Sequence, residues 1–197
     1  MGTDMKYDEG NRQLARLRGQ ISAIRSDMRD VIADMEPQPV EEHVFDSLGG
    51  QITLTALFGR ADELIIIHNM GRTCAYCTLW ADGYSGLYPH LKQRAGFVVA
   101  SPDTPQHQAE FARERGWRFP MVSDRGAAFA AKMGYAAADG SSRPGLSVLQ
   151  RRSGRLLRVT DSASSPHDDF CALWHLFDLL PGGTDGWTPR LVDTGAG

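Results

Sequence analysis

Apolar residues near the start of the chain recur at helical spacing. Between Asn11 and Met35 they follow one another by three or four positions, which predicts one long amphipathic helix. Pro37 and Pro39 end it, because the residue before a proline disfavours the α conformation. We expect this helix to be an arm that packs against the core or against a dimer partner. A helix that binds another partner is the alternative.

Further along, the apolar residues gather into short runs. Glu63–Met70 contains an unbroken run from Leu64 to Ile67, typical of a strand buried on both faces, and Gly96–Ala100 repeats the pattern. Pro105–Arg115 follows as a helix, with Thr104 or Ser101 as its cap. We expect further extended segments at His43–Ser47, Thr53–Phe58 and Phe119–Ser123. We expect further helices in the residues that follow Cys77 through Leu91 (irregular around Gly83–Gly86), at Ala127–Met133 and at His167–Leu180. A hairpin is expected to pair Leu146–Gln150 with Arg155–Val159 across Ser153–Gly154.

This order of elements predicts an α/β fold with parallel crossovers early and a hairpin late. It matches a thioredoxin-like fold, a central mixed sheet flanked by helices, with an extra N-terminal helix. Periodicity alone does not separate this fold from other α/β layouts, but the position of the cysteines does. We expect a helical arm over residues 1–40, a thioredoxin-like domain over 41–182 and an irregular tail over 183–197.

Composition and charge argue against nucleic acid and membranes as partners. The chain has 197 residues, a net charge of -3 and a pI near 6.0, so it carries no basic field for nucleic acid. No apolar run approaches the length that crosses a bilayer, and the polar N-terminus does not resemble a signal peptide. We therefore expect a cytoplasmic protein without membrane contact, where a close cysteine pair serves catalysis, redox sensing or metal binding.

The candidate chemistry lies in the motif Cys74–Ala75–Tyr76–Cys77, where a predicted buried strand ends and a helix begins. Unpaired backbone N–H groups and the helix dipole favour a thiolate there. Arg72 and His68 are nearby sources of positive charge. The two-residue spacer lets the sulfurs meet, which predicts thiol–disulfide exchange with a protein or small-molecule partner, the redox-active disulfide serving in place of a cofactor.

Four other interpretations of the cysteine pair stay open. A structural zinc site needs two more ligands, and the chain offers only Cys171 and scattered histidines, so we expect no bound metal. The two cysteines could instead be inert and buried. Finally, the chain could be a catalytically silent binding or scaffold protein, or a metal carrier. A homodimer is a further possibility, with the N-terminal helix and the aromatic C-terminal helix as its candidate surfaces.

Several segments resemble a known family. They are ELIIIHNM followed by GRTCAYCTLWADGYSG, then GFVVASP, RGWRFPMVSD, RPGLSVLQR and WHLFDLLP. Together they resemble the DUF899 family of thioredoxin-like proteins, which look like relatives of the peroxiredoxin and AhpC/TSA branch. The resemblance runs from about Leu48 to Leu180. It implies a thioredoxin-like fold and a redox role, and leaves the substrate undefined.

The wider superfamily implies roles for further residues. Pro144 looks like the cis-proline that faces the cysteines in thioredoxins, so we expect a cis Arg143–Pro144 bond; a trans proline opening an edge strand is the alternative. Arg143 would then face the sulfurs. Thr73 stands where thioredoxins have a tryptophan, which changes the partner surface. Cys77 has Cys74 three residues before it, where peroxiredoxins have a threonine, a departure from the peroxidase pattern.

His68 replaces the buried aspartate of thioredoxins. It is a candidate base for the second cysteine, with a core histidine bonded to backbone as the alternative. Trp80 is expected to pack in the core or rim, or to line the substrate site together with Arg72, Thr73, Arg143 and Pro144. In the expected mechanism Cys74 attacks and Cys77 resolves, while Cys171 is a small buried hydrophobe.

Overall fold

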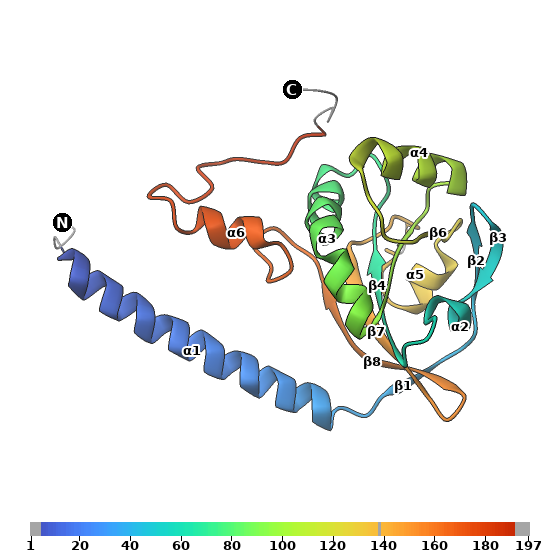
Figure 1. Cartoon of the computed structure of the whole chain (residues 1–197), viewed down its shortest axis with the longest axis horizontal. Helices are drawn as coiled ribbons and strands as arrows, with labels where there is room; N and C mark the ends of the chain where they lie inside the picture. The colour runs from blue at the N-terminus through green and yellow to red at the C-terminus, as the bar shows by residue number, and fades with distance from the viewer. Residues whose placement is uncertain (1–4, 138, 192–197) are drawn as a thin grey trace. The chain divides into compact units, whose positions relative to one another are not determined.

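The computed structural model describes residues 5–137 and 139–191, and the chain falls into two compact units, Met1–Glu36 and Pro37–Gly197. The first unit is the helix α1, Tyr7–Asp34, drawn in blue in Figure 1. It begins four residues earlier than the apolar pattern indicates and ends one residue before Met35. The prediction of a long N-terminal helix is confirmed.

The second unit is built on one 8-stranded mixed sheet with the strand order β1-β8-β7-β4-β5-β6-β2-β3. The central pairs β4–β5 and β5–β6 are parallel, and the other pairs are antiparallel. The strands are β1 (Gln38–Val40), β2 (Val44–Ser47), β3 (Gly50–Thr53), β4 (Glu63–His68), β5 (Gly96–Ser101), β6 (Met121–Ser123), β7 (Gly145–Arg152) and β8 (Arg155–Ala163).

Helices flank this sheet, as predicted, and Figure 1 shows them around its central strands. Alternate residues of the buried strands supply two separate apolar clusters: Ile66 belongs to one and Ile67 to the other. The two clusters confirm that β4 is buried on both faces. The helices of this unit are α2 (Leu54–Leu57), α3 (Ala75–Arg94), α4 (Pro105–Arg115), α5 (Ala128–Lys132) and α6 (Ala172–Phe177).

Three local predictions are wrong. The extended segment expected at Thr53–Phe58 is mostly the short helix α2, because the Thr53 hydroxyl accepts a hydrogen bond from the Ala56 N–H (3.2 Å) and caps it. The stretch around Gly83–Gly86 is regular helix within α3. The last helix covers only Ala172–Phe177 of the expected His167–Leu180. His167 has a left-handed backbone (φ 70°), and the Asp168 carboxylate accepts from the Phe170 N–H at 3.0 Å, so a turn precedes the helix.

The hairpin of β7 and β8 turns at the expected dipeptide. Ser153 and Gly154 both have positive φ, 50° and 74°, as a tight two-residue turn requires. Helix α4 has the predicted bounds, with Thr104 as its cap and Gly116 in the left-handed conformation at its end. The described residues contain no helix long and apolar enough to span a membrane.

Candidate redox site at the start of α3

Cys74 is the N-cap residue of α3. Strand β4 delivers the chain to this point, and Cys74 keeps an extended backbone (φ -87°, ψ 105°) before the helix starts at Ala75. Its Sγ accepts a hydrogen bond from the backbone N–H of Cys77 at 3.1 Å. Sulfur therefore occupies the position where a serine or threonine oxygen usually satisfies the free N–H groups of a helix.

The two sulfurs have opposite acidities. A hydrogen bond from the Cys77 thiol, helped by backbone N–H groups of Cys77 and Tyr76, lowers the pKa of Cys74 from 9.0 to about 7, although burial works against it. The same hydrogen bond and burial raise the pKa of Cys77 well above its usual value. All three cysteines are free thiols, and only Cys74 is partly exposed. The site thus holds one accessible thiolate beside one buried thiol.

The loop between β4 and α3 is held by two side chains. The amide oxygen of Asn69 accepts from the Gly71 N–H at 2.7 Å, and the Asp103 carboxylate accepts from the Arg72 N–H at 2.8 Å. Gly71 has φ 102°, and a Cβ there would lie 3.0 Å from an Asp103 carboxylate oxygen. Only glycine fits this position readily. The loop that presents Cys74 is therefore tied to the loop after β5.

An open pocket lies in front of Cys74, and Thr73 is on its wall. Part of the lining comes from segments that are distant in sequence, the turn at Gly126 and Ala127 and the loop at Ser141 and Ser142. The full lining is Met70, Thr73, Cys74, Ala75, Tyr76, Pro102, Gly126, Ala127, Gly140, Ser141 and Ser142. A molecule in this pocket would reach the Cys74 sulfur, whereas Cys77 is not part of the lining.

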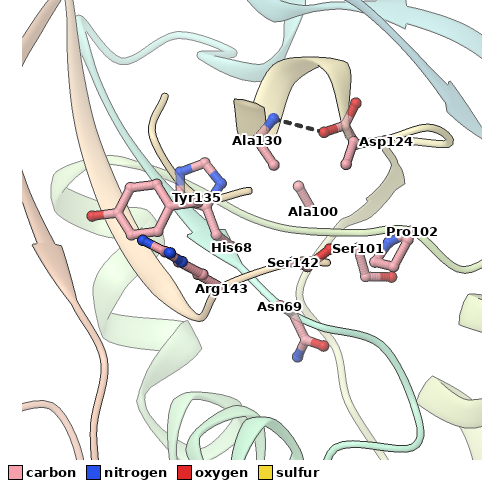
Figure 2. A pocket seen from close by; sticks show the side chains of 11 residues that line it. His68, Asn69, Ala100, Ser101, Pro102, Asp124, Ala130, Tyr135, Ser142 and Arg143 are labelled. Atoms are coloured by element: carbon pink, nitrogen blue, oxygen red, sulfur yellow. Dashed lines mark hydrogen bonds between the residues drawn. The ribbon is translucent and has the colours of Figure 1, made fainter. Parts of the chain in front are cut away.

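A second pocket adjoins the first and shares Pro102, Ala127 and Ser142 with it. Figure 2 shows Arg143 on the same side of this pocket as His68 and Tyr135, with Asp124 and Ala130 across from them. The structure thus brings Arg143 to the recess beside the cysteine pocket. Arg72, by contrast, lines neither pocket, although it directly precedes Thr73.

The expected cis bond before Pro144 is absent. Among the described residues there is no cis peptide bond, so the prediction is wrong. The bond is trans, as in the alternative, but the strand that Pro144 precedes, β7, lies between β8 and β4 and is not an edge strand. The physical reason lies in the flanking hydrogen bonds. The Arg143 N–H donates to the Tyr135 carbonyl (2.7 Å), and the Pro144 carbonyl accepts from the Ser164 N–H (3.0 Å), which leads the chain into β7. Pro144 still lines a small cavity together with Cys77.

His68 is a buried core residue. One ring nitrogen, Nε2, lies 2.9 Å from the Ser147 hydroxyl, and the ring stacks on Tyr135 with centroids 4.1 Å apart. Burial lowers its pKa to about 3, so the imidazole is neutral at physiological pH. His68 lines the same small cavity as Cys77. Its low pKa makes it a weak proton acceptor, which favours the core interpretation over the base.

Trp80 is turned away from the Cys74 pocket. Its side chain is buried, and the indole N–H donates to the Asp168 carboxylate at 3.2 Å. It lines the cavity next to Cys77, which fits the expected packing role rather than the substrate-lining one. Cys171 is buried too, in the apolar cluster that contains Trp80. No group of three or more His, Cys, Asp or Glu side chains within residues 5–137 and 139–191 is placed to hold a metal ion.

The sequence-based reasoning missed Asn69 and Asp103. Asn69 directly follows the buried parallel strand β4, and Asp103 closely follows its neighbour β5. Both residues therefore lie at the edge of the sheet where loops gather. A polar residue just after a buried strand is a signal that such reasoning could have used. Ser141 and Ser142 carried no comparable signal.

Comparison with known families decides the relationship. Residues 9–190 match the sequence profile of the family described as "Bacterial protein of unknown function (DUF899)". The chain belongs to the DUF899 family. The match includes most of α1 as well as the sheet-containing unit, and it confirms the resemblance inferred from the motifs. A comparison with curated proteins found no match.

Solved structures with a similar fold are peroxiredoxins. The peroxidoxin BcpB of Mycobacterium tuberculosis is 20% identical, with a TM-score of 0.58 over 69% of this chain and 88% of its own. A bacterioferritin comigratory protein of Xanthomonas campestris is 20% identical (TM-score 0.53; 62% and 81%). AhpC of Enterococcus faecalis is 14% identical (TM-score 0.53; 66% and 80%). At these identities the likeness confirms the thioredoxin-like fold of this DUF899 protein.

Proposed function

We propose that this protein is a thiol–disulfide oxidoreductase in which Cys74 is the attacking thiolate and Cys77 the resolving thiol. The observation that carries the proposal is the pairing of an accessible, N-capping sulfur of low pKa with a buried thiol that donates a hydrogen bond to it. With a pKa of about 7, roughly half of Cys74 is a thiolate at neutral pH. No further cofactor is needed.

In the first step the Cys74 thiolate attacks one sulfur of a disulfide substrate in the open pocket. A bond forms between Cys74 and that sulfur, and the other half of the substrate leaves as a thiolate. The negative charge has then left Cys74. Because Cys77 no longer donates to a thiolate, the main cause of its raised pKa is gone, while the Met70 N–H still lies 3.5 Å from its sulfur.

In the second step Cys77 gives up its proton to solvent and attacks the Cys74 sulfur. This forms the Cys74–Cys77 disulfide and releases the second half of the substrate as a thiolate. The substrate has gained two electrons, and the protein has lost two. Two external thiols, from a protein or a small molecule, return the site to its dithiol form. We place this cycle in the cytoplasm, where such reductants are abundant.

A hydroperoxide is a second candidate substrate, favoured by the peroxiredoxin-like fold. The Cys74 thiolate would take the terminal oxygen of the peroxide and become a sulfenic acid, while the alcohol leaves. The Cys77 thiol would then condense with it, releasing water and forming the same disulfide. The absence of a threonine three residues before Cys77 makes the disulfide substrate our first choice.

The experiment compares reduced wild-type protein with the variants Cys77→Ser and Cys74→Ser, each incubated with glutathione disulfide and, separately, with an alkyl hydroperoxide. We expect wild type to form the internal disulfide, Cys77→Ser to accumulate a glutathione adduct on Cys74, and Cys74→Ser to stay unmodified. Intact-mass and peptide mapping measure all three. Cys171→Ser is the matched control and behaves as wild type, because Cys171 is buried.

Two outcomes would overturn the proposal. An adduct on Cys77 in the Cys74→Ser variant would reverse the order of the two cysteines. A wild-type protein that reacts with neither oxidant would be a silent thioredoxin-fold protein, and the search would then turn to binding partners. Reaction with the hydroperoxide alone would replace the disulfide substrate by the second candidate.

A further inference from the structure

The helix α1 carries a regular apolar stripe that its own unit does not bury. The distance in sequence from one apolar residue of the stripe to the next is alternately three and four positions, which is the heptad spacing of a left-handed coiled coil. No residue of α1 is buried, and Ile24 and Val31 are 58% and 60% exposed. In heptad terms Leu14, Ile21 and Met28 occupy the a positions of α1, and Leu17, Ile24 and Val31 occupy the d positions.

Local interactions give α1 little support of its own. Gly10 and Gly19 lie inside it, and each costs about 1 kcal/mol relative to alanine. The N-cap makes no side-chain hydrogen bond, and the last turn has no basic residue to offset the helix dipole. A helix of this kind is stable mainly when its apolar face is packed. The stripe therefore requires a partner.

We propose that this partner is α1 of a second copy of the same chain, in a parallel two-stranded coiled coil. The spacing itself favours another heptad helix over a sheet or a flat surface, because a 3.5-residue repeat stays in contact only with a helix that supercoils around it. An identical helix supplies that repeat in the same register.

The charges beside the stripe set the orientation. Arg18 and Arg25 occupy e positions, while Gln20 and Asp27 occupy g positions. A parallel pair in register brings g positions next to the e positions of the following heptad, so Gln20 meets Arg25 of the second copy and no like charges face each other. An antiparallel pair aligned on the same stripe places e against e, so Arg18 faces Arg25 and repels it.

The test measures the mass of the full-length protein in solution by sedimentation equilibrium. We expect wild type to have the mass of two chains and Ile24→Asp, which puts a charge into the stripe, to have the mass of one. Ser26→Asp is the matched control. It adds the same charge two residues away on the opposite face of α1, at an f position, and we expect it to remain a dimer. Protection of the buried Cys171 from an alkylating agent checks that each variant is folded.

Orientation is tested with single cysteines in a Cys74→Ser, Cys77→Ser background under mild oxidation. Leu14→Cys places a thiol at an a position, where a parallel pair brings the two copies of residue 14 together. We expect a covalent dimer, and none from Ser22→Cys on the outer face. A monomeric wild type, a mass of three or more chains, or a dimer that survives Ile24→Asp would overturn the proposal. A dimer that Leu14→Cys does not cross-link would overturn the parallel orientation. None of these results depends on the proposed redox activity.

Discussion

Two helices of the sheet-containing unit begin in the same way but with different chemistry. Both α3 and α4 follow a central parallel strand, and both have an extended N-cap residue whose side chain accepts a hydrogen bond from the backbone N–H three residues later. In α4 the acceptor is the Thr104 hydroxyl, bonded to the His107 N–H at 3.3 Å. In α3 it is the Cys74 sulfur.

The difference shows what the fold contributes to the chemistry. A helix N-terminus stabilises negative charge on its cap, but a hydroxyl cannot ionise near neutral pH and so Thr104 only caps. A thiol can ionise, and the same geometry favours the thiolate of Cys74. Residue 77 adds a second donor, the Cys77 thiol, at the position where α4 has the exposed His107. The cap of α3 is thus an ordinary helix cap with sulfur at two positions.

We expect the largest effect on Cys74 reactivity from a substitution of Asp103. This residue directly precedes the N-cap of α4, and its carboxylate binds the loop before α3. In Asp103→Ala the Arg72 N–H loses its acceptor, which costs about 1.5–3 kcal/mol of the interaction that fixes the loop. We expect the rate at which Cys74 reduces a disulfide to fall roughly tenfold, since 1.4 kcal/mol is a factor of ten. Stopped-flow or thiol-release kinetics at neutral pH measures this rate.

Asp103→Asn is the matched control, because its amide oxygen still accepts from the Arg72 N–H while the charge is gone. We expect it to keep most of the wild-type rate. Faster reaction in both variants would contradict the account, since it would mean that the carboxylate acts on Cys74 through its negative charge and not by holding the loop.

The sequence carried enough information to locate the candidate redox motif but not the residues that support it. The apolar run before Gly71 predicted a buried strand, so Cys74 had to lie where a helix begins. Asn69 and Asp103, by contrast, act through contacts between loops, which local patterns do not encode. The isomer of the Arg143–Pro144 bond was mispredicted for the same reason. The backbone there is held by hydrogen bonds to Tyr135 and Ser164, which are distant from it in sequence.

The fold was predictable to a similar degree. Strands buried on both faces have a strong sequence signature, and β4 and β5 were found with nearly their observed bounds. The apolar residues after His167 also follow helical spacing, yet α6 starts only at Ala172. There the backbone turn at His167 and the contact of Asp168 with Trp80, 88 residues away in sequence, override the periodic pattern.

A smaller effect should follow from giving α4 the sulfur that it lacks. In a Cys74→Ser, Cys77→Ser background, Thr104→Cys places a thiol at the equivalent cap of α4. We expect its pKa to fall below the ordinary value of about 8.5, because the helix start favours the thiolate. It should remain above the pKa of Cys74, because no neighbouring thiol donates to it. The pH dependence of iodoacetamide labelling at residue 104 gives this value. An unshifted pKa at residue 104 would mean that the cap position alone does not activate sulfur.

The most direct test of the account is the rate of Cys74 alkylation by iodoacetamide in the reduced wild-type protein, measured against pH and read out by peptide mass. Only the thiolate reacts, so the rate rises as Cys74 loses its proton and levels off above its pKa. The account predicts that the rate of Cys74 labelling has its midpoint near pH 7 and that Cys77 stays unlabelled over the same range. In Cys77→Ala, which lacks the thiol donor, the midpoint for Cys74 should be higher. A midpoint of 8.5 or above for Cys74, or equal labelling of both cysteines, would contradict it.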